Sequence, residues 1–501
     1  MRPRLGLAGA VLLGAALRLY PIWFGLPYAQ ARPDETASLG RAVAILAGDT
    51  NPHFFHWPSL ALYLFAGLIT VAGAVTAPLD FSGYALIART SVALAGTVTI
   101  LVLARLTWRV TADAGTATVA ALLLAIAPLH VRESHFAMTD VLMTLFATAA
   151  LGLLVEAAET PSLKTLALAG LAGGLATSTK YSAAPLLLSV FVADLRTRAI
   201  AVYITAFAFA FTAGTPYSLL DFQTFRTDFI FISQHLASEH VAGSLGRGWT
   251  SHLVRSLPYG MGIPAFIAAV AGGLLVLTRH RRRAMPIVVF ALAFLLAIGS
   301  GRTVFFRYIL PLIPLACLAA AVALRSIAGP LGRLLPVRYA SVTLTGVIVA
   351  LVAGVPLANS VRMDVLLGRT DSRVLASEWL VPQLRPEQTL HDAGGDYTRL
   401  DLGRAQFHDW PYDPSARSFG APAGALPDWI VLYDSPLTEY AKVPESLRDL
   451  VAQRYRLVHE VRAMRADEGA VFDRQDAFFL PIAGFSGVER PGPNVAIYFR
   501  R

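Results

Sequence analysis

The sequence has a single cysteine, Cys317, and few charged residues, which make up 15% of its 501 positions. One cysteine cannot form an intramolecular disulfide, so a disulfide-stabilised fold is excluded. We find no repeat of fixed period and no tract of low complexity, which excludes repeat architectures. What the chain does have is hydrophobic residues, at 55% of all positions. This composition is typical of integral membrane proteins.

The apolar residues occur in blocks of about 17–25, the length that crosses the hydrocarbon core of a bilayer. We predict a mainly α fold, a polytopic bundle of about eleven transmembrane helices. The predicted spans lie near residues 5–24, 86–108, 114–131, 138–157, 163–178, 182–195, 199–217, 258–278, 284–300, 308–325 and 339–358. Three glycines inside one span, Gly170, Gly173 and Gly174, indicate close helix packing rather than a phosphate-binding loop.

Lys and Arg in the short loops predict the orientation, because cationic flanks resist translocation. A cytoplasmic N-terminus places the run from Arg279 to Arg283 inside, provided that residues 59–78 return to the outer surface. If residues 59–78 cross instead, the same run lies outside, and the sequence leaves both alternatives open. The first helix has no small-x-small cleavage site, which favours a retained anchor. We therefore expect a multi-pass protein of the cell membrane.

The composition changes past Asn359, where Asp, Glu, Arg, Pro and Gly become frequent. We predict a membrane domain over residues 1–358 and a small extracytoplasmic α/β domain over residues 359–501. Within the membrane domain, outer loops are expected at residues 25–85, with juxtamembrane helices, and at residues 218–257. In the soluble domain the patterns predict strands at 428–434 and 494–500 and helices at 372–384 and 446–455.

The net charge of +9 raises the question of a nucleic-acid partner. The basic residues are scattered over predicted loops rather than gathered on one face with exposed aromatic residues, so nucleic acid is not an expected partner. His53 and His56 form a His-x-x-His pair that suits a divalent ion, but His-x-x-His spacing is weak evidence. Beside Phe54, Phe55 and Trp57 the two histidines also suit a membrane-interface belt. We expect no cofactor and leave a divalent metal as an open alternative.

Polar residues of particular types collect at the predicted outer ends of the spans. Asp34 and Glu35 follow the first span, and the later members are His56, Arg132, His135, Asp140, Lys180, Tyr217, Asp221 and Arg307. Ionised groups beside hydrocarbon are costly and are functional candidates. The mixture suits group transfer from an anionic lipid carrier, since a carboxylate can deprotonate an acceptor and cations can bind the departing phosphate.

The order of these motifs over residues 5–324 resembles the GT-C glycosyltransferases. The motifs are Asp34-Glu35, His56-Trp57-Pro58, the Arg/Ser/His run that closes on Asp140, Gly174-Leu175-Ala176 through Lys180, and Arg307-Tyr308-Ile309-Leu310-Pro311-Leu312. Within that group the chain is most similar to the protein O-mannosyltransferase and aminoarabinose transferase superfamily. Trp57 stands where aminoarabinose transferases often have a lysine before the proline, which argues against modification of lipid A.

The resemblance implies transfer of one sugar from a polyprenyl-phosphate donor to an extracytoplasmic lipid, glycan or protein, with inversion. It implies that Asp34 is the general base, that Glu35 orients it or touches the donor, and that Asp140 binds donor or acceptor. Lys180 and Arg307 would hold the carrier phosphate. We add one further candidate for phosphate binding, Arg132, and four for substrate binding, which are His56, His135, Tyr217 and Asp221.

Two other classes of protein fit a polytopic chain. A lipid or solute transporter would show paired halves with broken helices and polar residues near the bilayer midplane. Here the charges gather at one predicted surface, and the two halves of the sequence do not match. A polysaccharide polymerase or ligase would be expected to use Arg and His clusters in a late loop rather than a carboxylate pair in the first loop.

Overall fold

The computed structural model of the chain describes residues 3–75, 79–193, 195–333, 340–420, 422, 424–466 and 469–501. The chain forms two compact units. The first contains Met1–Ile22, Ala37–His240 and Ser244–Val361, and the second contains Trp23–Thr36, Val241–Gly243 and Arg362–Arg501. Residues 23–36 lie in the predicted membrane domain, whereas the structure groups this segment with the C-terminal residues.

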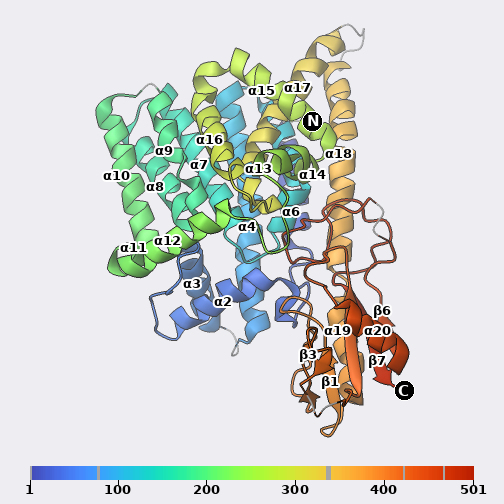
Figure 1. The fold of residues 1–501 in the computed structure, drawn as a ribbon. Coiled ribbons are helices and arrows are strands. Elements are labelled where there is room, and N and C mark those ends of the chain that lie inside the picture. The colour runs from blue at the N-terminus through green and yellow to red at the C-terminus, as the bar shows by residue number, and fades with distance from the viewer. Residues whose placement is uncertain are drawn as a thin grey trace. The chain divides into compact units, whose positions relative to one another are not determined.

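The first unit is built from helices joined by turns and loops (Figure 1). The two helices α2 and α18 begin or end in the second unit. In chain order the helices are α1 (Pro3–Leu19), α2 (Pro33–Leu46), α3 (Leu60–Gly73), α4 (Phe81–Thr111), α5 (Ala114–Ala125), α6 (Pro128–Glu133), α7 (Asp140–Glu159), α8 (Leu163–Thr179), α9 (Leu186–Ser189), α10 (Thr197–Gly214), α11 (Tyr217–Leu220), α12 (Phe222–Ala237), α13 (Gly248–Ser251), α14 (Leu257–Met261), α15 (Ile263–Arg279), α16 (Arg281–Gly299), α17 (Leu312–Arg333) and α18 (Ala340–Leu367).

Among the described residues, five helices are long and apolar enough to cross a membrane, or six if one bent pair counts as a span. They include α4, α7, α10 and α16, and the fifth stretch begins in α18. The prediction of about eleven spans is therefore wrong by this measure, although the helical polytopic class is confirmed. Several predicted spans lie on shorter helices, since α1 and α8 have 17 residues each.

Helix breaks account for two other differences. The predicted span at 182–195 is not one helix, because it consists of the short helix α9 between two 3-10 turns, Tyr181–Ala183 and Val190–Val192. Near the predicted span at 258–278, α14 and α15 are bent by 114° at Gly262, whose φ of +89° a residue with a side chain rarely adopts. The predicted outer loop at 218–257 contains the helix α12.

The glycines of α8 serve close packing against α10, as predicted. A Cβ on Gly170 would lie 2.3 Å from the carbonyl oxygen of Tyr203, and one on Gly174 would lie 2.2 Å from that of Phe207. Small residues let helix backbones approach in this way. The contact positions the C-terminal end of α8, where Lys180 follows Thr179.

The second unit contains a mixed five-stranded sheet with the strand order β2-β1-β5-β7-β6. Strand β1 runs parallel to β2 and β5, and β7 runs antiparallel to β5 and β6. A two-stranded antiparallel sheet of β3 and β4 accompanies it. The strands are β1 (Thr389–Asp392), β2 (His408–Asp409), β3 (Tyr412–Asp413), β4 (Ser418–Phe419), β5 (Trp429–Asp434), β6 (Tyr455–Val461) and β7 (Asn494–Arg500), with helices α19 (Ser372–Leu380) and α20 (Glu445–Arg454).

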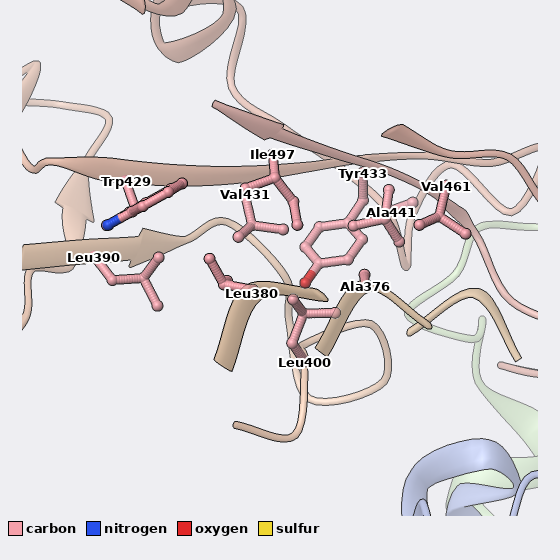
Figure 2. Packing of buried hydrophobic residues seen from close by; sticks show 11 residues of the cluster. Ala376, Leu380, Leu390, Leu400, Trp429, Val431, Tyr433, Ala441, Val461 and Ile497 are labelled. Carbon is pink, nitrogen blue, oxygen red and sulfur yellow. The ribbon is translucent and has the colours of Figure 1, made fainter. Parts of the chain in front are cut away.

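The central strand β5 is buried on both faces, which explains its continuous apolar sequence. Val431 and Tyr433 of β5 point toward Leu380 of α19 (Figure 2). The alternate residues Ile430 and Leu432 pack with residues of α20 on the other face. The predicted strands and helices of this unit are confirmed, except that Pro382 lies in a 3-10 turn after α19 instead of extending the helix to residue 384.

Candidate functional site

An ion pair of Asp140 and Lys180 lies in the first unit. Asp140 is the first residue of α7, and Lys180 follows the last residue of α8. Helices α7 and α8 follow each other in the sequence and pack together, so the first residue of α7 lies near the last residue of α8. The Lys180 Nζ donates to the Asp140 Oδ1 at 2.6 Å, and the aspartate is buried. Asp140, predicted to bind donor or acceptor, and Lys180, predicted to hold the carrier phosphate, are thus in direct contact.

Arg307 lies close to this pair, in the 3-10 turn Phe306–Ile309 that precedes α17. The Lys180 Nζ is 4.6 Å from the ring centroid of Tyr308, and the Arg307 guanidinium carbon is 5.9 Å from the same centroid. The guanidinium also lies over Phe305, at 4.1 Å. Two cations therefore face one aromatic ring, and Lys180 interacts electrostatically with Arg307.

The buried residues Arg132 and Glu133 of α6 complete this group. The Arg132 Nε lies 3.4 Å from the Glu133 Oε1, and Glu133 also interacts electrostatically with Lys180. The five residues Arg132, Glu133, Asp140, Lys180 and Arg307 form what we term the cation cluster. It carries one more positive than negative formal charge, which suits an anionic group. Glu133 was not predicted as a site residue, and the structure shows that it is buried.

The carboxylates Asp34 and Glu35 belong to the second unit, in the first turn of α2. The Asp34 side chain is 39% exposed, whereas Glu35 is buried. A helix N-terminus favours negative charge, which stabilises a carboxylate at this position. Asp34 is therefore the more accessible side chain of the pair.

Arg32 stands directly before this turn and has its own partners. Its Nη1 donates to the Asp476 Oδ1 at 2.5 Å, and its Nη2 is 3.9 Å from the Asp34 Oδ2. The guanidinium lies 5.5 Å from the ring centroid of Phe478. Asp476 thus holds Arg32 in place beside Asp34. Sequence reasoning missed both Arg32 and Asp476, because residues more than 440 positions apart share no local pattern.

Tyr217 and Asp221 hold the loop that follows α2. The Tyr217 hydroxyl lies 2.6 Å from the Thr50 Oγ1, and the Asn51 Nδ2 donates to the Asp221 Oδ2 at 2.9 Å. Asp221 also accepts from the backbone N–H of Thr224 at the start of α12. Both predicted substrate-binding residues therefore contact the first predicted outer loop.

The two histidines of this loop contact different partners. His53 lies 3.4 Å from the Asp49 Oδ2 and 3.9 Å from the Asp221 Oδ2. His56 instead stacks on Phe231, with ring centroids 4.7 Å apart. Within the described ranges, no group of three or more His, Cys, Asp or Glu side chains is arranged to hold a metal ion. The structure therefore places His56 among aromatic rings.

His135 is fully buried, and backbone groups occupy both of its ring nitrogens. Nδ1 lies 3.0 Å from the carbonyl oxygen of Val131, and Nε2 lies 2.8 Å from that of Tyr20. The contact joins the chain after α6 to the chain after α1. His135 therefore contacts main-chain oxygens of two separate segments of the first unit.

Comparison with known families gives a match over residues 81–220, to the family described as dolichyl-phosphate-mannose-protein mannosyltransferase. The matched segment runs from α4 to α11 and includes Arg132, Asp140 and Lys180 of the cation cluster. No curated protein sequence matches the chain.

Solved structures share the fold. ArnT from Cupriavidus metallidurans, bound to undecaprenyl phosphate, has a TM-score of 0.55 at 16% identity, over 98% of this chain and 97% of that one. The oligosaccharyltransferase of Archaeoglobus fulgidus in the apo form has a TM-score of 0.56 at 12% identity, over 100% of this chain and 88% of that one.

A third structure is the oligosaccharyltransferase AglB from Archaeoglobus fulgidus, in complex with an inhibitory peptide and a dolichol-phosphate. It has a TM-score of 0.51 at 14% identity, over 76% of this chain. The chain spans 58% of the length of that protein. The multi-pass membrane class and the predicted resemblance are confirmed, since residues 81–220 match the family described as dolichyl-phosphate-mannose-protein mannosyltransferase and the chain shares the fold of ArnT and of the Archaeoglobus fulgidus oligosaccharyltransferase.

Proposed function

We propose that the chain transfers a single sugar from a polyprenyl-phosphate donor to an extracytoplasmic lipid, glycan or protein, with inversion of the anomeric carbon. The observation that carries the proposal is the cation cluster. Its Arg132, Asp140 and Lys180 lie inside the family-matched segment, and Lys180 is in contact with Asp140 at 2.6 Å. A buried group with excess positive charge is what a departing polyprenyl phosphate requires.

The proposed reaction breaks one bond and forms one. The oxygen of an acceptor hydroxyl attacks the anomeric carbon from the face opposite the phosphate, and the bond from that carbon to the phosphate oxygen breaks. The electron pair leaves with the polyprenyl phosphate, whose negative charge Lys180 and Arg307 stabilise. Asp34 takes the proton of the acceptor hydroxyl as general base. Attack from the opposite face inverts the anomeric configuration.

Two of the structurally similar proteins support a lipid-phosphate donor. The ArnT structure contains undecaprenyl phosphate, and the AglB structure contains a dolichol-phosphate with an inhibitory peptide. Both lipids are polyprenyl phosphates. We extend this ligand class to the present chain, with the N-terminus in the cytoplasm and residues 359–501 on the outer side.

Asp34→Asn tests the proposal, because an amide cannot accept the proton of the acceptor. Surface lipids, polysaccharides and glycoproteins would be compared by mass spectrometry among a deletion strain, the parent and strains that carry Asp34→Asn or the exposed control Asp396→Asn. We expect Asp34→Asn to lack the same sugar-modified product as the deletion strain, since a general base contributes roughly 10²–10⁴-fold. A full product level with Asp34→Asn would contradict the assignment of the base. A deletion strain with no missing product would contradict the transfer itself.

A further inference from the structure

A turn of the second unit, residues 393–400, follows strand β1 and lies beside the segment that carries Asp34. The Tyr28 hydroxyl, from the same segment as Asp34, donates to the carbonyl oxygen of Arg399 in this turn at 2.7 Å. Asp34 also interacts electrostatically with Tyr397 of the turn. Two parts of the chain that are far apart in the sequence therefore meet near the proposed general base.

A second set of contacts joins Tyr397 to this segment. The Tyr397 ring packs edge to face on the ring of Tyr440, with centroids 5.5 Å apart. The Tyr440 hydroxyl donates to the carbonyl oxygen of Gln475 at 2.6 Å. The next residue, Asp476, forms the ion pair with Arg32 beside the proposed base. Tyr397 is thus connected to the surroundings of the base from two directions.

The backbone of the turn is fixed by a buried carboxylate. Asp392 accepts from the backbone N–H groups near both ends of the turn, those of Gly394 at 2.8 Å and Leu400 at 3.0 Å. Tyr397 lies between these two points. Its position is therefore set before a ligand arrives, and a preorganised group loses little conformational freedom on binding.

The Tyr397 side chain can reach a ligand. Tyr397 is 39% exposed, and its hydroxyl makes no hydrogen bond with any residue that the structure describes. Partial burial and the negative charge of Asp34 raise the pKa of Tyr397, so the hydroxyl stays protonated and can donate. The hydroxyl of the neighbouring Tyr440 is already bonded to the protein. Of the two packed tyrosines, Tyr397 is therefore the one with a donor to offer.

We propose that Tyr397 binds the acceptor and that this acceptor is a glycan, an inference that rests on the proposed sugar transfer. A sugar ring offers several hydroxyl groups, so one can give its proton to Asp34 while another pairs with the Tyr397 hydroxyl. The C–H groups of the sugar pack against the tyrosine ring, because tyrosine has an apolar body and a polar tip. A serine or threonine side chain of a protein acceptor has one hydroxyl and cannot serve both groups.

The first test identifies the bond that the enzyme forms. Membranes and surface fractions of the deletion strain supply donor and unmodified acceptor, and the products made from them by the purified full chain are fragmented in a mass spectrometer. We expect the transferred sugar on a hydroxyl of another sugar. A sugar on a serine or threonine of a protein, or on a non-sugar part of a lipid, would overturn the glycan as acceptor and leave sugar transfer in place. No product from any fraction would overturn both the sugar transfer and the present inference.

The second test measures KM for the acceptor fraction, with its concentration expressed as total sugar. Tyr397→Phe removes only the hydroxyl, so the acceptor KM should rise roughly two- to tenfold, the value of one hydrogen bond. The kcat and the KM for the donor should stay near the parental values. Tyr397→Ala also removes the ring and should raise the acceptor KM further. The control Tyr412→Phe removes a hydroxyl that is bonded to the Ser446 Oγ at 2.9 Å, and it should leave these constants unchanged.

An acceptor KM of Tyr397→Phe equal to that of the parent, with product still formed, would overturn the role of Tyr397 and leave the proposed sugar transfer standing. A lower kcat at an unchanged acceptor KM would also overturn it, because this result indicates an altered fold rather than a lost contact with the acceptor. Tyr397→Phe keeps the ring that packs on Tyr440, so it provides the decisive reading if Tyr397→Ala does not fold.

Discussion

Two ion pairs with a buried aspartate, one from each unit, differ in how completely the protein satisfies them. In the second unit, the Arg373 Nε and Nη2 donate to both oxygens of Asp371, at 2.8 and 2.7 Å. In the first unit, Lys180 donates to the Oδ1 of Asp140, and the Oδ2 accepts no hydrogen bond from a described residue. The Arg373–Asp371 pair is closed, because both carboxylate oxygens accept from the arginine. The Lys180–Asp140 pair is open, because the Asp140 Oδ2 can still accept a hydrogen bond from a further partner.

The residues around Arg373 and around Lys180 differ in the same way. The Arg373 guanidinium also donates to the carbonyl oxygen of Tyr397 at 2.6 Å and lies over the rings of Tyr28 and Phe479, at 4.7 and 5.3 Å. Lys180 keeps 20% of its side chain exposed and has Arg307 as a cationic neighbour. A satisfied pair stabilises a fold, while an incompletely satisfied one beside a second cation can accept a substrate.

The largest expected effect is a loss of sugar transfer when the open pair of Asp140 and Lys180 is removed. Asp140→Asn/Lys180→Met removes both charges of the open pair, so no buried charge is left alone. We expect sugar transfer by the purified enzyme to fall by roughly 10²–10³-fold, the usual loss when one stabilising donor is removed. The thermal unfolding temperature should change little. Transfer at the parental rate would show that this pair is structural like the other, and the exposed Lys164→Met is the matched control.

The closed pair is expected to control stability instead. Arg373→Met leaves the Asp371 carboxylate buried without its partner, and such a change costs about 3–5 kcal/mol of the free energy of unfolding. Denaturant unfolding followed by tryptophan fluorescence measures this loss, with the exposed Arg462→Met as control. The turnover per folded molecule should stay at the parental value. A variant as stable as the parent would remove the distinction between the pairs.

Asp392 is a further buried acid of the second unit, and its raised pKa makes its contribution to stability depend on pH. Burial raises its pKa to about 6, although the carboxylate accepts from the backbone N–H groups of Gly394 and Leu400. Because the folded-state pKa is raised, its stability contribution is present below about pH 4 and is lost as the pH rises through about 6. Two pKa units correspond to about 3 kcal/mol.

Asp392→Asn should therefore gain stability relative to the parent by up to about 3 kcal/mol between pH 4 and pH 7. Unfolding temperatures measured across this range for the parent, Asp392→Asn and the exposed control Asp396→Asn test the expectation. Parallel curves for the parent and Asp392→Asn would contradict it. The Asp396→Asn curve should run parallel to that of the parent.

The smallest expected effect on activity comes from single cysteine substitutions. Their labelling tests which residues lie outside the cell. In a Cys317→Ala background, cysteines at Ser244, Arg282 and Ser415 would be treated with a membrane-impermeant maleimide on intact cells. The excess of cations at Arg279 to Arg283 predicts labelling at Ser244 and Ser415 and protection at Arg282. Labelling at Arg282 with protection at Ser415 would invert the protein and exclude an outer donor.

Composition and periodicity were sufficient for several features. The long apolar runs predicted α4, α7 and α16, and the short apolar runs that begin near Trp429 and Asn494 predicted β5 and β7. These features depend on residues close together in the chain, whose side chains must all meet the same environment. The resemblance likewise named Asp140 and Lys180, because each closes a short local motif.

Other features depend on contacts between distant residues, and here the folded chain was required. The pairing of Arg32 with Asp476, the burial of Glu133 and the 114° bend at Gly262 have no local signature. Nor does any pattern distinguish the closed Arg373 from the open Lys180, since both are single cations beside hydrophobic residues. The difference is a matter of how many donors and acceptors the surrounding elements supply, which is settled when helices and strands pack together.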